Sequence, residues 1–161
     1  MLQNPEFRFS LADGALLKSG DPLWRRSIPV DRRAFLASGG LPCATADFCY
    51  GDYFLAARRF LSRNDCAVLR EAVSLRLGRT IAADSLARVS IQLEKHGAFY
   101  HPARVEVLSA DRLLAFVLNV AFSAAGKRAL QREWGLLQRL TASTDCAYLP
   151  RVYAHAEAPP E

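Results

Sequence analysis

The stretch from residue 86 to residue 123 constrains the fold most, because its hydrophobic period is two. Within LARVSIQLEKHGAFYHPARVEVLSADRLLAFVLNVAFS, apolar residues alternate with other residues in three runs, which hold Val89, Ile91 and Leu93, then Val105 and Val107, then Phe116, Leu118, Val120 and Phe122. Alternation of this kind is typical of strands with one buried face. The pattern therefore predicts three antiparallel strands.

Turn sequences separate these predicted strands. The first turn, KHGAFYHP, contains Gly97, which tolerates backbone angles closed to other residues, and Pro102, which begins the returning strand. The second turn is LSADRL. Two short connections of this type predict that the strands lie side by side in sequence order.

A helix is predicted after the third strand. In KRALQREWGLLQRL, which follows Gly126, the residues Leu130, Trp134 and Leu137 share one stripe at helical spacing. We expect this helix to pack back onto the sheet. The segment LPRVYAHAE, residues 149–157, has the composition of a further strand.

The first 80 residues have a different pattern. FRFSLADG predicts a short strand, and helices are expected near 52–63 and 65–77, with Asn64 or Asp65 capping the second helix and Gly78 ending it. The segment is too apolar for a disordered tail. It should dock on the sheet through its apolar and aromatic residues, which include Phe7, Phe9, Leu23, Trp24, Ile28 and Phe35.

Composition restricts the class of protein. The chain has 161 residues, of which 51% are hydrophobic, so one domain or slightly more is expected. It contains no apolar run of the roughly 18–20 residues that a membrane span needs, and its start lacks the features of a signal peptide, which predicts a cytoplasmic protein. The cysteines form no Cys-x-x-Cys pair and are expected to be reduced thiols, namely Cys43, Cys49, Cys66 and Cys146.

These patterns together predict an α+β fold. An antiparallel β-sheet of three to five strands with one packed helix should occupy residues 81–161, and residues 1–80 should form a helical N-terminal extension docked on the sheet.

The order of strands and helix in residues 86–157 resembles the small N-terminal lobe of the protein-kinase-like superfamily, in the style of kinases that phosphorylate small molecules such as aminoglycosides. In that family a lysine on the third strand pairs with a glutamate on the helix and contacts the nucleotide phosphates. The resemblance places Asn119 at the lysine position and Glu133 at the glutamate position. It also places Gly97 and Phe99 at the tip of the loop that covers the phosphates.

The chain departs from the family pattern at several points. An amide at Asn119 cannot supply the positive charge that holds a triphosphate, and the hairpin has one glycine instead of Gly-x-Gly-x-x-Gly. No His-Arg-Asp loop and no Asp-Phe-Gly motif follow residue 157, and the upstream ADFCYGD has Cys49 in place of the glycine. The resemblance thus implies no catalytic residues and no cofactor in this chain, with ATP and Mg²⁺ bound only if a catalytic lobe is supplied elsewhere.

Other candidate sites carry weaker signals. Gly126-Lys127 is not a phosphate loop, because position 121 is alanine and position 128 is arginine, so a strand-to-helix connection is predicted. His96 and His101, with Glu94, could form a metal site, but on a regular strand the two histidines would face opposite sides. No metal site is therefore predicted.

Three functions follow from the sequence. The favoured one is an incomplete kinase-like domain without phosphotransfer activity of its own, which needs a missing catalytic lobe or a protein partner. The second is a protein-interaction or scaffold domain unrelated to kinases. The least favoured is a nucleic-acid-binding domain that would use the net charge of +5 and the pairs Arg25/Arg26, Arg32/Arg33 and Arg58/Arg59.

Overall fold

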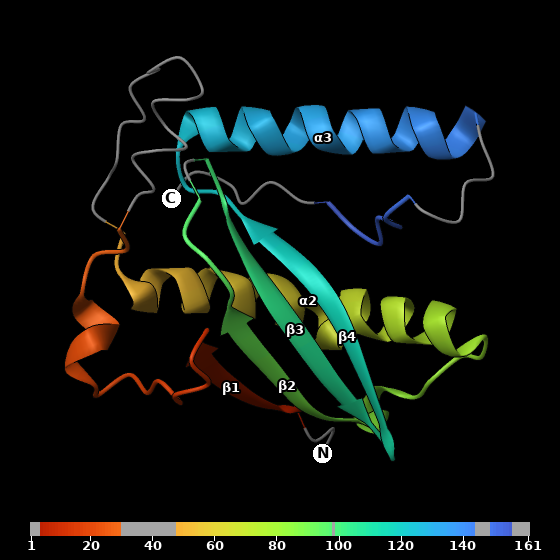
Figure 1. The fold of residues 1–161 in the computed structure, drawn as a ribbon. Coiled ribbons are helices and arrows are strands. Elements are labelled where there is room, and N and C mark those ends of the chain that lie inside the picture. The colour runs from red at the N-terminus through yellow and green to blue at the C-terminus, as the bar shows by residue number, and fades with distance from the viewer. Residues whose placement is uncertain (1–3, 30–47, 98, 144–148, 156–161) are drawn as a thin grey trace.

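The computed structural model describes residues 4–29, 48–97, 99–143 and 149–155 (Figure 1). The fold is α+β, as predicted. Two short 3₁₀ helices, η1 and η2, accompany the main elements. In chain order the elements are β1 (Glu6–Leu11), η1 (Pro22–Arg25), α2 (Tyr50–Leu77), η2 (Ala83–Ser85), β2 (Leu86–Leu93), β3 (His101–Ser109), β4 (Arg112–Val120) and α3 (Ala124–Ser143).

The strands form one four-stranded sheet in the order β1-β2-β3-β4. β2, β3 and β4 pair antiparallel, which confirms the three strands predicted from the two-residue period. β1, which is the strand predicted from FRFSLADG, pairs parallel with β2 and makes the sheet mixed. The predicted N-terminal extension therefore contributes a strand to the sheet itself, and the division into two domains stays a prediction.

The core lies between α2 and one face of the sheet (Figure 1). Val89, Ile91, Val105 and Val107 project from β2 and β3 and are fully buried or nearly so. Phe54 of α2 is fully buried and packs on Phe9 of β1, and Trp24 stacks on Phe54, in line with the predicted docking of the N-terminal aromatic residues. Phe35, which was expected in the same cluster, lies outside the described residues.

α2 consists of two helical segments joined at a kink. Arg63 has ψ 140°, and the next three residues have positive φ, between 49° and 58°. Asn64 and Asp65 tolerate the left-handed region better than most residues do, so the break falls where the sequence predicts the boundary between two helices. Gly78 ends the second segment with φ 68°, as expected for a C-terminal glycine.

α3 does not lie on the sheet, contrary to the sequence-based expectation. Figure 1 shows it beyond the end of the sheet at which β4 stops, and Gly126 is its one buried residue among those described. α2 already covers the apolar face, and the opposite face of β2 and β3 is polar, with Arg88, Ser90, Gln92 and Arg104. The apolar face of the sheet is thus already occupied by α2.

The further strand predicted in residues 149–157 is also absent from its described part, residues 149–155. Pro150 has no backbone N–H to donate to a ladder. Ring contacts hold the segment instead: Tyr153 packs edge-on against Phe116 at 5.4 Å between ring centroids, and His155 stacks on Trp134 at 4.7 Å.

Candidate functional site

The connection between β2 and β3 gathers histidine and tyrosine side chains from distant parts of the chain. The Tyr50 hydroxyl of α2 lies 3.0 Å from Nε2 of His96, and the Tyr53 hydroxyl donates to the carbonyl oxygen of His101 at 2.9 Å. Burial raises the pKa of both tyrosines, so both hydroxyls keep their protons at neutral pH. These contacts fasten the connection to the first turns of α2.

The two histidines come together although they are five positions apart. Their ring centroids are 6.1 Å apart at an interplanar angle of 74°. The described residues between the strands, 94–97, 99 and 100, lie outside the regular ladder, so the rings are not held on opposite faces. The backbone N–H of Gly97 donates to Nδ1 of His101 at 3.1 Å, which requires Nδ1 to be unprotonated. Burial lowers the pKa of His96, and burial together with the nearby His96 lowers that of His101 to about 4.

A metal site would need a third ligand at this pair. Within the described ranges, no three histidine, cysteine or acidic side chains gather closely enough to hold an ion. The neutral imidazoles are used instead in hydrogen bonds to Gly97 and Tyr50. The arrangement therefore positions backbone and does not resemble a coordination sphere.

The tip of the connection contacts α3 at two points. The Tyr100 hydroxyl donates to the Glu133 carboxylate at 2.9 Å. The carbonyl oxygen of Phe99 lies so close to Gly126 that a Cβ there would collide with it. We define the hairpin-tip cluster as His96, Gly97, Phe99, Tyr100, His101, Gly126 and Glu133.

Three of the four residues carried over from the kinase resemblance lie in this cluster, namely Gly97, Phe99 and Glu133. Gly97 has no space for a side chain, since a Cβ would meet the carbonyl oxygen of Tyr100. The fourth, Asn119, is half-buried near the end of β4 and lies opposite Pro102 in the register with β3. Asn119 is thus one ladder position from His101, beside the cluster.

Asn119 belongs to the sheet face that no described helix covers, which we call the open face. Alternation along the strands places on it Glu6, Arg8 and Ser10 of β1, Arg88, Ser90 and Gln92 of β2, Pro102, Arg104, Glu106 and Leu108 of β3, and Leu113, Ala115, Val117 and Asn119 of β4. A shallow groove of about 240 Å³ crosses its polar half. Two ion pairs neutralise part of the basic charge there, Arg8 with Glu6 at 2.9 Å and Arg104 with Glu106 at 2.7 Å.

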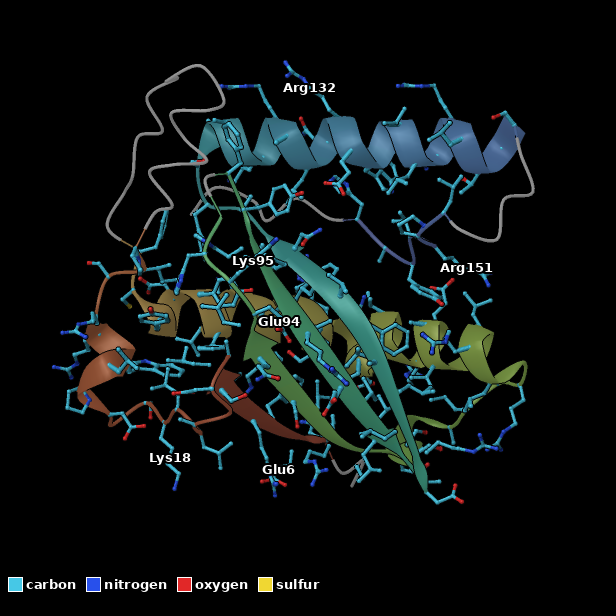
Figure 2. All side chains as sticks on the ribbon, in the orientation of Figure 1. Glu6, Lys18, Glu94, Lys95, Arg132 and Arg151 are labelled. Carbon is cyan, nitrogen blue, oxygen red and sulfur yellow. The ribbon has the colours of Figure 1, made fainter. Side chains whose placement is uncertain are left out.

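A second hollow of about 550 Å³ opens beside the cluster at the ends of β1 and β2. Its lining includes Leu11, Asp13, Pro29, Leu93 and His96. Figure 2 shows the side chains of the described residues, with Glu94 and Lys95 labelled where β2 leads into the hairpin, and Arg132 pointing from α3 away from the sheet. Charged groups therefore flank the cluster. No hydrogen bond between the described residues joins the side chain of Glu94, Lys95 or Arg132 to it.

Gly126-Lys127 lies in the first turn of α3, as the predicted strand-to-helix connection requires. The Lys127 N–H donates to the Ser123 carbonyl oxygen at 2.9 Å, and the Gly126 N–H donates to the Ser123 hydroxyl at 3.0 Å. Ser123 therefore caps the helix, and the amides of Gly126 and Lys127 are already satisfied.

The cysteine and arginine predictions can be followed only in part. Cys49 and Cys66 are free thiols, whereas Cys43 and Cys146 lie outside the described residues, as do Arg32 and Arg33. Burial raises the pKa of the Cys66 thiol. Cys66 is therefore a small core side chain and not an activated nucleophile.

Comparison with known proteins adds no family: no family model, no curated protein and no solved structure matches the chain. Over the described part of the chain, neither long helix is apolar enough along its length to cross a membrane.

Proposed function

We propose that this chain is a kinase-like small lobe that does not transfer phosphate by itself and that acts by binding a catalytic lobe or another protein partner. The order of its elements supports the proposal, since an antiparallel meander of three strands is followed by one long helix. The contact between Tyr100 and Glu133 supports it further, because it ties the helix glutamate to the hairpin tip.

The observation that carries the proposal is the exposure of α3. A helix of 20 residues gains most of its stability in water from burying one face, yet the one buried residue of α3 is a glycine near its start. Trp134 is only half-buried, and Leu136 is 48% exposed. The exposed Leu136 and the half-buried Trp134, whose ring stacks on His155, form the apolar surface of α3 that a second lobe would cover.

The open face supplies the other half of the proposed interface. Val117 and Leu113 are 76% and 55% exposed there, next to Asn119. In a complete kinase-like protein, a lysine at this position would hold a nucleotide between two lobes. With Asn119 in its place, the open face can still contact a partner, but it lacks the positive charge that would hold a triphosphate.

Restoring the lysine tests the kinship. We expect Mg-ATP to leave the melting temperature of the wild-type chain unchanged and to raise that of Asn119→Lys by a few degrees, because ligand binding to the folded state is stabilising. Adding Glu133→Gln to Asn119→Lys should remove most of that increase. The matched control is Leu113→Lys, which adds the same charge to the same face of β4 six positions away and should give no increase.

A folded Asn119→Lys variant that Mg-ATP does not stabilise would argue against the kinase-like interpretation. The exposed apolar surface of α3 and the open face would then support the unrelated scaffold domain, which needs the same surfaces but no nucleotide site. An equal increase in the Leu113→Lys control would show a general charge effect and would also contradict the kinship.

A further inference from the structure

The free edge of β4 has the properties of a pairing surface. β4 is the last strand of the sheet, so one side of its backbone has no strand partner among the described residues. The Glu94 N–H donates to the Pro102 carbonyl oxygen, so even-numbered residues of β3 direct their backbone groups toward β2. The register with β3 then directs Leu113, Ala115, Val117 and Asn119 outward.

The hydrogen bond from Arg76 of α2 agrees with this assignment. Its guanidinium donates to the carbonyl oxygen of Ala115 at 3.2 Å, so that oxygen does point away from β3. Among the outward groups of β4, this is the one for which the structure records a hydrogen bond within the described residues. The remaining outward groups form a row of donors and acceptors available to another strand.

The sequence of β4 does nothing to prevent such pairing. Its nine residues, RLLAFVLNV, contain no proline or glycine and one charged residue, Arg112. Natural edge strands usually carry inward charges, prolines or bulges that block association. The opposite edge of the sheet differs, because β1 is shorter, carries Glu6 and Arg8, and bends back through a bridge between Ser10 and Leu16.

We propose that the edge of β4 pairs antiparallel with β4 of a second copy of this chain, which joins two four-stranded sheets into one. A two-fold axis beside Phe116 overlaps the full strand and places Arg112 opposite Val120, so no like charges meet. It also places Leu113 opposite Asn119 and Ala115 opposite Val117 on the open face. Val117, which is 76% exposed, and Leu113, which is 55% exposed, then gain cross-strand neighbours from the copy, while their outer surface stays on the open face.

Arg76 limits this pairing. Its guanidinium lies over the Phe116 ring at 5.4 Å and occupies the Ala115 oxygen, which the second strand requires. Arg76 must therefore release this oxygen when the two strands pair. Replacing Arg76 with a neutral residue should strengthen association, an effect opposite to that of blocking the edge.

The test is sedimentation equilibrium of the full chain over a concentration series. Val117→Pro removes an outward N–H that β3 does not use, so the monomer should keep its fold while the edge is blocked. Val117→Lys adds a charge on both copies near the two-fold axis. We expect the wild type to form a dimer. The dissociation constant of the dimer should rise at least about tenfold in Val117→Pro and Val117→Lys, and it should fall in Arg76→Gln.

The control separates this edge from the exposed apolar surface of α3. Leu136→Lys removes an exposed leucine from α3 and should leave the dimer unchanged. Circular dichroism of each variant confirms that the fold is retained. A monomer at every concentration, a dimer that Val117→Pro and Val117→Lys leave intact, or a dimer lost in Leu136→Lys overturns the proposal.

Discussion

α2 and α3 are both long helices of this chain, but they differ in how much of their surface is buried. α2 buries side chains along its whole length against the sheet, including Tyr53, Phe54, Leu61, Leu69 and Val73, whereas Gly126 is the one buried residue among those described in α3. Both sequences carry an apolar stripe. The difference arises because α2 occupies the apolar face of the sheet, so the described residues leave α3 only smaller contacts, such as the stack of Trp134 on His155.

The largest expected difference between the helices lies in the cost of truncating an apolar side chain. Phe54→Ala leaves a cavity in the core between α2 and β1 and should lower the free energy of unfolding by about 3–5 kcal/mol. Leu136→Ala in α3 should change it by less than about 0.5 kcal/mol. Urea denaturation of both variants provides the measurement, and similar losses in both would mean that α3 is packed as firmly as α2.

The contact between α2 and the hairpin tip should depend on pH. The pKa of His101 falls from its usual 6.5 to about 4 on folding, and that of His96 falls as well. The unfolded chain therefore binds more protons than the folded chain between these values, and stability is constant above about pH 6.5 and decreases below it. Because water screens the half-buried ring in part, the His101 shift should lower the unfolding free energy by about 1 kcal/mol between pH 7 and pH 5, and by no more than about 2 kcal/mol.

A variant without the titrating ring makes a useful comparison. His101→Asn retains an acceptor oxygen near the position of Nδ1 and has no group that titrates in this range. Thermal unfolding of the variant between pH 7 and pH 5 should show a smaller loss than the wild type. An equal loss would place the titrating group elsewhere.

A smaller effect is expected where the hairpin tip contacts α3. Gly126→Ala forces a Cβ against the Phe99 carbonyl oxygen and should cost about 1 kcal/mol after the gain in helix propensity. Gly135→Ala is the matched control in the same helix, because its Cβ meets only the Arg139 guanidinium at an ordinary 3.8 Å. The control should stabilise the chain by up to about 1 kcal/mol. Stabilisation in both variants would show that the Phe99 contact is absent in solution.

The strands could be predicted from the sequence because their signal is local. The alternation around Val105 and Phe116 can be recognised from residues close in the sequence, and the turns between the strands are short. The kink in α2 was predictable for the same reason, since Asn64 and Asp65 form a boundary that can be recognised without knowledge of the rest of the fold.

The hairpin-tip cluster was predicted only in part. Gly97, Phe99 and Glu133 were brought in by the family resemblance, but the partners Tyr50 and Tyr53 lie 46 and 48 residues from the groups they bind. In the sequence Tyr53 belongs to the apolar stripe of the helix predicted near 52–63 and Tyr50 precedes that helix, and no local pattern distinguishes a hydroxyl that will reach a histidine. The predicted position of α3 was wrong for a related reason, because the pattern shows that a face is apolar but not which surface covers it.

Amide hydrogen exchange tests most directly the claim that the described part of the chain leaves most of α3 uncovered. We expect slow exchange in β2, β3 and α2, with free energies of opening near that of global unfolding, and exchange in α3 that is faster by at least about tenfold. Protection of α3 equal to that of β3 in the monomeric chain would contradict the account, because the helix would then be stabilised by contacts that leave no surface for a second lobe.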